Sequence, residues 1–258
     1  MDSIFKHTEN NGEAIITGLQ RALTETSIFI PETINGIPVV EIGPEAFRST
    51  SITDIKIGEN IKKIGEKAFY MCEKLQSVTW HCQCDVIPAF CFDKCSNLTQ
   101  FDFSGIKKIG QYVFYKSGLQ EVYLTEKIEI LDKGTFSGCS KLQSVTWHCQ
   151  CDVIPADCFF GCSDLMQFDF SGVKKIEARA FMGSGLTSVR LSKKTAVEQS
   201  CFACCNDLEK IEWLSDRNIE KTIFAECKNI KEIFISDKVK NIEVSAFTSS
   251  HNAEITFV

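Results

Sequence analysis

Short runs of alternating hydrophobic and polar residues recur along the chain between residues 75 and 235. A period of two is typical of β-strands that bury one face. In the run LQEVYL, Leu119, Val122 and Leu124 are expected to point inward, and Glu121 and Tyr123 outward. The runs that each predict one strand are LQSVTW, LTQFDF, LQEVYL, LMQFDF, LTSVRL, LEKIEW and IKEIFI.

A regularly spaced phenylalanine marks the repeat to which these strands belong. Its ten copies are 21 to 23 residues apart. An aliphatic residue lies five positions before each copy, and Cys, Ser or Thr lies three positions after it. The ten copies are Phe47, Phe69, Phe92, Phe114, Phe136, Phe159, Phe181, Phe202, Phe224 and Phe247.

The repeat length predicts the fold. A period of about 20–29 residues with one strand per unit is typical of leucine-rich repeats. One such unit cannot cover its own apolar face, whereas stacked neighbours can. We therefore predict an α/β leucine-rich repeat solenoid, with one parallel-sheet strand per 21–23-residue unit and short helical or irregular segments on the opposite face. Residues 1–30 are predicted to form an N-terminal capping segment, and residues 31–258 about ten units of a single solenoid domain.

The unit IKKIGEKAFYMCEKLQSVTW resembles the BspA-like leucine-rich repeat family, also described as the Treponema pallidum type. The opening AIITGLQ…IFIPETINGIPVVEIGPEAF is similar to that family's N-terminal entry into its first repeat. The resemblance covers roughly residues 13–258. It implies a surface or secreted protein of the kind found in host-associated bacteria and anaerobic protists, with a role in adhesion and protein binding.

Composition and termini narrow the classes of function. The 258 residues carry a net charge of −6 without a run of five or six like charges, so no basic patch for nucleic acid is expected. No apolar run approaches the roughly eighteen residues of a membrane span, so no membrane insertion is expected. The first residues lack a basic segment followed by an apolar one, the pattern of a signal peptide. This predicts a cytoplasmic or non-classically exported protein, whereas the resemblance implies the cell surface or secretion.

The segment HCQCDVIP occurs at residues 81–88 and again at residues 148–155, and its His and Cys residues are candidate metal ligands or reactive thiols. The copies are three units apart, or roughly 14 Å at the usual strand spacing. Zinc ligands lie about 2.0–2.3 Å from one ion, so the two copies cannot share a tetrahedral site. Alignment of the units places Cys84 and Cys151 at inward aliphatic positions and Cys82 and Cys149 in the turn after the strand. We therefore interpret the motif as structural and predict no metal site, with a metal or redox protein as an alternative.

Duplication explains why the motif occurs twice. Residues 75–114 and 142–181 are identical at 30 of 40 aligned positions. Most of the other cysteines among the fourteen fall next to the repeated phenylalanine or three positions after it. There they are expected to pack as small hydrophobic residues. Adjacent units bring such positions within disulfide reach, so pairs such as Cys72–Cys95 are an alternative if the protein is exported.

No catalytic constellation is evident. The sequence has no HExxH, GxSxG, GxGxxG or Walker motif, and its four histidines form no recognisable arrangement with a cysteine. Carboxylates are spread along the strands. We therefore predict a protein that is not an enzyme and that has no cofactor.

The outward strand positions are the candidate binding surface. The curved sheet of a solenoid is an extended surface on which a partner protein or a glycan can lie. Tyr123, Arg190 and Phe234 are side chains of the kind that anchor interfaces, and Asp102, Asp169 and Glu212 are expected to set charge preference. The predicted partner-binding residues are Asp102, Tyr123, His148, Asp169, Arg190, Glu212 and Phe234.

The alternative function is structural. The sequence ends on AEITFV, a predicted strand with no polar cap after it. An uncovered edge strand is prone to pair with another chain. End-to-end homodimerisation or further self-assembly through this strand would then matter more than ligand capture.

Overall fold

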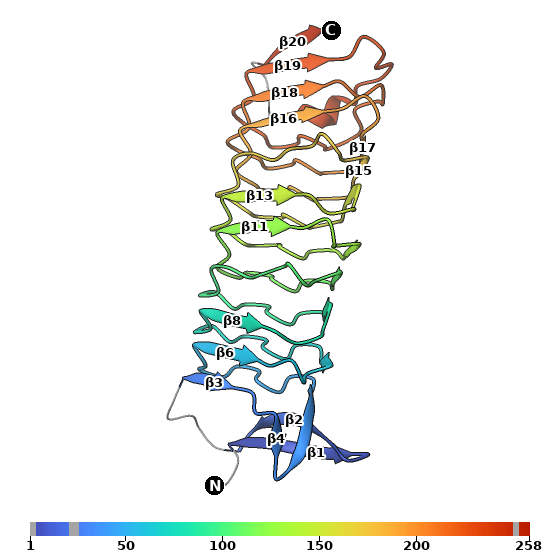
Figure 1. The fold of residues 1–258 in the computed structure, drawn as a ribbon. Helices are drawn as coiled ribbons and strands as arrows, with labels where there is room; N and C mark the ends of the chain where they lie inside the picture. The colour runs from blue at the N-terminus through green and yellow to red at the C-terminus, as the bar shows by residue number, and fades with distance from the viewer. Residues whose placement is uncertain (1–3, 21–25, 250–252) are drawn as a thin grey trace.

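The computed structural model describes residues 4–20, 26–249 and 253–258. They form an elongated stack of coils in which each repeat adds one turn, from the N-terminal end at the bottom of Figure 1 to the C-terminal end at the top. Most coils contain a strand of the main sheet, a second and shorter strand or irregular segment, and a tight turn that holds the repeated phenylalanine. The predicted leucine-rich repeat solenoid is therefore confirmed.

The longer strands form the parallel sheet that the alternating runs predict. Corresponding residues pair from unit to unit, as in Tyr123 with Thr146 and Arg190 with Glu212. In β11 the burial alternates as expected, with Val122 and Leu124 inside. These strands are β3 (Ser27–Phe29), β6 (Asp54–Ile57), β8 (Ser77–Trp80), β11 (Glu121–Leu124), β13 (Ser144–Trp147), β16 (Ser188–Leu191), β18 (Lys210–Trp213), β19 (Glu232–Ile235) and β20 (Glu254–Phe257).

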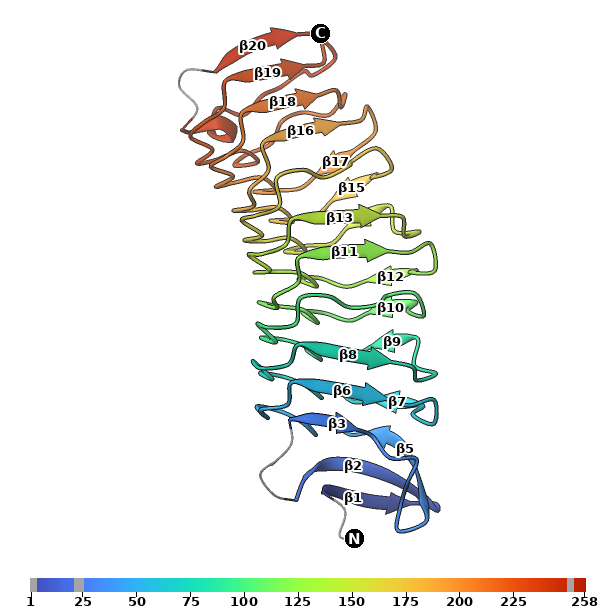
Figure 2. The ribbon, with the colours of Figure 1, turned by 60° about the vertical axis from the view of Figure 1, so that its left-hand side comes forward.

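Shorter strands form a second set of parallel ladders on another side of each coil (Figure 2). Each is two residues long and buries its second residue, apart from β17, whose two residues are partly buried, and the six-residue β5 at the start of the series. They are β5 (Ile37–Ile42), β7 (Lys63–Ile64), β9 (Val86–Ile87), β10 (Lys108–Ile109), β12 (Ile130–Leu131), β14 (Val153–Ile154), β15 (Lys175–Ile176) and β17 (Ala196–Val197).

Helix is nearly absent from the described residues, which contain one 3-10 helix, η1 (Val244–Phe247). The segments outside the main sheet are thus irregular or short strands. At the N-terminus, β1 (Phe5–Asn10) and β2 (Glu13–Leu19) form an antiparallel hairpin, and β2 also pairs with β5, which in turn pairs with β4 (Thr33–Ile34). The boundary of the capping segment at residue 30 stays a prediction.

Two of the predicted strands, LTQFDF and LMQFDF, are not strands in the structure. The main sheet is interrupted at both places, between β8 and β11 and between β13 and β16. Both runs place Phe at the inward position where the neighbouring unit has Val, as Phe101 corresponds to Val78. Phe101 packs 5.5 Å from Phe92 and 5.3 Å from Phe114, centroid to centroid. We attribute the break to the bulk of these rings, which keeps the backbone from forming regular ladder hydrogen bonds.

The two sets of ladders are interrupted at different levels. The shorter ladders break between β7 and β9, between β12 and β14, and after β17. At each of these levels the main sheet is continuous, as β6 pairs with β8, β11 with β13, and β16 with β18. Where the main sheet breaks, the shorter strands β9, β10 and β12, or β14, β15 and β17, are paired. From β6 to β19, every junction between neighbouring coils therefore keeps one ladder.

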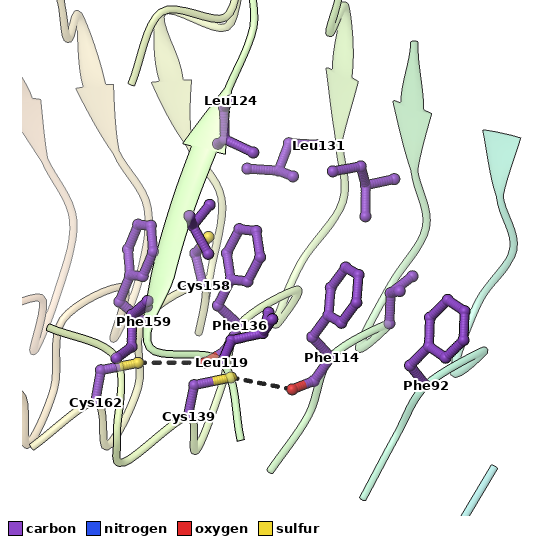
Figure 3. Close-up of a cluster of buried hydrophobic side chains, with 14 of the residues drawn as sticks. Phe92, Phe114, Leu119, Leu124, Leu131, Phe136, Cys139, Cys158, Phe159 and Cys162 are labelled. Carbon is purple, nitrogen blue, oxygen red and sulfur yellow. Dashed lines mark hydrogen bonds between the residues drawn. The ribbon is translucent and has the colours of Figure 1, made fainter. Parts of the chain in front are cut away.

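A column of phenylalanine rings fills the centre of the solenoid (Figure 3). The rings from Phe47 to Phe224 are fully buried. Neighbouring rings from Phe47 to Phe247 are stacked nearly parallel, from 5.1 Å between Phe159 and Phe181 to 5.8 Å between Phe114 and Phe136. Such offset aromatic pairs add stabilisation beyond the area that they bury. The repeated residue from which the fold was predicted is therefore its structural core.

The cysteines three positions after the phenylalanine do more than fill space. The thiol of each donates to the backbone carbonyl of the phenylalanine one unit earlier, for example Cys139 Sγ to Phe114 O at 3.1 Å (Figure 3). Cys162 makes the same bond to Phe136 O at 3.2 Å. All fourteen cysteines are free. A thiol suits this position because it is small, apolar and still a weak donor.

Candidate binding surface

The sheet places the predicted binding residues on one exposed face but in separate groups. The outward residues of neighbouring strands lie side by side because the pairing is parallel and in register. Arg190, Glu212 and Phe234 thus occupy one row across β16, β18 and β19. Tyr123 on β11 lies in the corresponding row opposite Thr146 on β13.

Tyr123 and His148 form the first group. The Tyr123 side chain is 54% exposed, although the residues on either side of it are inside or at the edge of the core. Its ring meets the His148 ring edge to face at 5.6 Å, and its hydroxyl lies 3.4 Å from His148 Nδ1. The contact fixes an exposed aromatic side chain in one orientation, which lowers the entropy that a partner must remove on binding.

Arg190, Glu212 and Phe234 form the second group, together with Lys210. Arg190 Nε lies 3.3 Å from Glu212 Oε2, and Lys210 Nζ lies 3.2 Å from Glu212 Oε1. Lys210 Nζ also lies 5.0 Å from the centre of the Phe234 ring. Two cations thus share one carboxylate beside a partly buried aromatic ring. Glu232 lies opposite Lys210 on the neighbouring strand, so this surface combines both signs of charge.

Asp102 and Asp169 do not join either group. Each lies in one of the two interrupted strands and accepts a hydrogen bond from the backbone of the turn that follows. Ser104 N donates to Asp102 Oδ1, and Ser171 N donates to Asp169 Oδ1, both at 2.9 Å. Both side chains remain exposed. Their role in charge preference stays a prediction, and the contacts give them a local role in shaping a turn.

The two HCQCDVIP loops are held by tryptophan. Trp80 Nε1 donates to Cys84 O at 3.0 Å, and Trp147 Nε1 donates to Cys151 O at 2.9 Å. Trp213 makes the same bond to Arg217 O at 3.0 Å in a loop without cysteines. The loop is therefore closed through the backbone and does not depend on a thiol. The predicted inward position is observed for Cys84, which is buried, and in part for Cys151.

Residues 4–20, 26–249 and 253–258 contain no group of three His, Cys, Asp or Glu side chains placed to hold a metal ion. Within the same ranges, no helix is both long and apolar enough to cross a membrane.

A second exposed feature lies on the turn side and was missed in the sequence. Residues two positions before and one position after the repeated phenylalanine line a groove there, among them Phe90, Tyr112, Tyr115 and Phe160. The signal was available, because aromatic residues at these positions occur in three successive units.

Comparisons with known proteins agree on the architecture. The profile of the BspA type leucine rich repeat region matches residues 24–143 and residues 129–254. No curated protein matches the sequence. A leucine-rich repeat protein from Bacteroides ovatus has a similar solved structure, with a TM-score of 0.71 at 20% identity over 100% of this chain and 78% of that one.

Two further solved structures are similar. The Treponema pallidum leucine-rich repeat protein has a TM-score of 0.62 at 23% identity, covering 81% of this chain and 91% of its own. A leucine-rich cell surface protein from Faecalibacterium prausnitzii also has a TM-score of 0.62 at 23% identity, covering 96% of this chain and 73% of its own. At these identities the likeness concerns the fold.

Proposed function

Because the chain belongs to the BspA-type leucine-rich repeat family, we propose that it is a non-enzymatic interaction module that binds a partner protein along the exposed face of its main sheet. An adhesin-like role at the cell surface is part of this proposal. It is supported by the family and by the structural similarity to a cell surface protein of Faecalibacterium prausnitzii.

The observation that carries the proposal is the ordered, uncovered set of side chains on β11 to β19. Tyr123 is more than half exposed yet held by His148. Arg190 is exposed and paired with Glu212. Aromatic and arginine side chains that are fixed before binding are the residues that contribute most to protein interfaces.

The test is capture of a partner by the wild type and by the triple variant Tyr123→Ala, Arg190→Glu, Phe234→Ala. The control is Tyr70→Ala, Arg48→Glu, which makes two of the three chemical changes on the turn side of the solenoid, at residues that do not line the groove. Circular dichroism verifies that all three proteins are folded. We expect the sheet variant to lose a partner that the control retains; equal capture by both variants would show that the sheet face is the wrong surface.

Self-association through β20 is a second candidate, because a specific feature favours it. β20 pairs with β19 on one side, and no other strand of the described residues pairs with it. Ile255, Phe257 and Val258 are each more than half exposed. A parallel edge strand with apolar side chains is suited to pairing with a second copy.

Light scattering as a function of concentration tests this second candidate. The wild type is expected to form dimers or longer assemblies, and Ile255→Lys, Phe257→Lys to be monomeric. The exposed lysines discourage edge pairing without changing the core. A wild type that stays strictly monomeric at high concentration removes the idea.

A further inference from the structure

The groove on the turn side has the composition of a ligand site. It has a volume of about 450 Å³ and spans several coils between Phe90 and Arg179. Aromatic side chains form its walls, and Asp93, Ser137 and Asp157 are among its polar lining residues. Sites for small ligands typically combine apolar walls with a few convergent polar groups.

The aromatic walls are fixed by contacts with one another. The Phe90 and Tyr112 rings are stacked at 5.7 Å with an angle of 11° between their planes. Tyr115 meets Tyr112 edge to face at 6.0 Å. The Tyr112 ring lies over Gly134, where a Cβ atom would come 2.1 Å from Tyr112 Cε1. Glycine at this position, with a φ of +64°, therefore leaves the space that the ring occupies.

Asp93 is the unusual residue of the groove. It is 6% exposed, and its Oδ1 atom is buried without a hydrogen-bond partner in the described part of the chain. Burial raises the pKa of Asp93 to about 6. Two later units carry Ala203 and Ala225 at the corresponding position, one residue after the phenylalanine. The fold thus has no need of a carboxyl group there, and an unpaired buried carboxylate is costly.

Positive charge surrounds this carboxyl group. Lys67 lies over the Phe90 ring at 5.7 Å, Lys116 over Tyr115 at 5.2 Å and Lys133 over Tyr112 at 5.9 Å, each from Nζ to the ring centre. At the other end of the groove, Arg179 holds Asp157 through two hydrogen bonds of 2.7 and 2.9 Å. Cations therefore outnumber carboxylates, which disfavours a cationic ligand.

The duplicated blocks differ at the groove. Among their ten differing positions are the pairs Phe90/Asp157, Asp93/Phe160 and Tyr112/Arg179. Both members of each pair line the groove. In contrast, the blocks are identical at the outward strand positions, such as His81 and His148. The groove is therefore assembled from unlike copies of the same positions, and it extends from the first copy of the block into the second.

We propose that this groove binds a sugar ring of an acidic glycan. The ring stacks its C–H face on the aromatic walls, where the negative faces of the aromatic rings meet weakly positive C–H groups. Sugar hydroxyls donate to the Asp93 carboxylate, which lines the groove. The lysines at the rim attract the acidic group of the ligand. The site is on a different side of the solenoid from the sheet face, so it stands or falls independently of the function proposed above.

Isothermal titration with defined oligosaccharides tests the proposal. The acidic probes are 3′-sialyllactose and trigalacturonic acid, and the neutral probes are lactose and maltotriose. The variants are Asp93→Ala and Phe160→Ala in the groove, with Tyr123→Ala on the sheet face as the control. We expect an acidic probe to bind the wild type and the control alike, and a neutral probe to bind at least about fivefold more weakly.

The two groove variants make the result specific. We expect Asp93→Ala to weaken binding at least about tenfold, because the ligand loses a hydrogen bond to a charged group. The same substitution is expected to raise the melting temperature, because it removes an unpaired buried carboxylate from the fold. Phe160→Ala is also expected to weaken binding; its ring is 38% exposed, so the fold is retained. The proposal is overturned if no acidic probe binds, if neutral probes bind equally, or if the groove variants bind like the wild type.

Discussion

The two copies of the duplicated block, residues 75–114 and 142–181, are nearly the same on two sides of the solenoid and different on the third. Phe92 and Phe101 meet at 5.5 Å and 53°, and their counterparts Phe159 and Phe168 meet at 5.5 Å and 54°. The tryptophan bond that closes each loop is 3.0 Å in one copy and 2.9 Å in the other. Both copies also interrupt the main sheet at the same position.

On the turn side, corresponding positions in the two copies carry different types of side chain, which are apolar, acidic or basic. Phe90 in the first copy is stacked on Tyr112, whereas the corresponding Asp157 in the second is paired with Arg179. A core position must fit the ring above and the ring below it, so its identity is constrained by stacking. A turn position lies outside this column of rings, so stacking does not constrain its identity. The difference teaches that the turn side is where this solenoid can change its chemistry without changing its fold.

The largest effect is expected for the stacked rings. Phe92→Ala and Phe159→Ala are each expected to lower the free energy of unfolding by about 3–5 kcal/mol, because each leaves a cavity between two rings. The two costs are expected to agree within about 1 kcal/mol, since the contacts are the same in both copies. Urea unfolding followed by circular dichroism measures both. If the loss of free energy of unfolding in one copy were less than half of that in the other, the two copies would not be equivalent in the core.

Substitutions of the two acidic residues of the groove are expected to change the free energy of unfolding in opposite directions. Asp93 has its pKa raised to about 6 by burial, whereas its ordinary value is 3.8. Its ionised form therefore destabilises the fold, increasingly from about pH 4 to pH 6 and fully above pH 6. Asp93→Ala is expected to raise the free energy of unfolding by about 2 kcal/mol at pH 8, and to have little effect below pH 4.

Asp157→Ala is the comparison substitution in the second copy, at the position that corresponds to Phe90. It removes the partner of Arg179, which is about half exposed, so a loss of about 1 kcal/mol is expected at pH 8. Unfolding of both variants across pH 4–8 checks the pair. Stabilisation by both substitutions, or a gain for Asp93→Ala that does not depend on pH, would contradict the explanation from burial.

The thiol column gives a smaller effect. Cys95 and Cys162 each donate to a phenylalanine carbonyl at 3.2 Å, and Ser117 and Ser184 occupy the same column in other units. Cys95→Ala and Cys162→Ala are each expected to cost about 1 kcal/mol, because the carbonyl loses its donor. The serine variants are expected to cost less than the alanine variants. Equal costs for serine and alanine would show that the hydrogen bond contributes nothing.

The exposure of the cysteine thiols distinguishes the two copies, and it can be measured without changing the stability of the protein. Four cysteines are partly exposed, namely Cys82, Cys149, Cys151 and Cys204, and the other ten are buried. Burial also raises the pKa of Cys139 and Cys201 to about 12, which suppresses the reactive thiolate. Alkylation of the native protein is expected to modify those four residues first, with one site in the first HCQC loop and two in the second. Mass spectrometry after a short pulse locates the modified sites, and early labelling of a phenylalanine-column thiol would contradict the burial.

The regular part of the fold could be predicted from the sequence because one side chain specifies it. The spacing of the phenylalanines fixed the length of each coil, and the alternation around Val122 assigned the inner and outer faces. The breaks at LTQFDF and LMQFDF could not be predicted, since Phe101 and Phe168 keep the alternation and only their bulk disturbs the ladder. The alternation of hydrophobic and polar residues indicates which side chains are buried, but it carries little information about side-chain volume.

The sheet face and the groove also differ in how far they could be predicted from the sequence. Exposure of Tyr123, Arg190 and the other outward residues followed from alternation, but their grouping depended on register between strands. The aromatic residues that line the groove recur visibly in the sequence, but their grouping into one site depended on backbone geometry. Phe90 and Tyr112 adopt positive φ angles of 58° and 51°, which are uncommon for residues with bulky side chains. No glycine marks those two positions, so no turn of this form was evident in the sequence.

The staggered interruption of the two sets of ladders has a mechanical consequence. A rod fails where the bonds across one plane are weakest. With both ladders broken at one level, only the turn-side hydrogen bonds, such as Phe92 N to Val113 O, and the phenylalanine column would cross that plane. Here each junction from β6 to β19 keeps at least one ladder beside the continuous phenylalanine column. A pulling force along the axis therefore meets hydrogen-bonded backbone at every junction between coils.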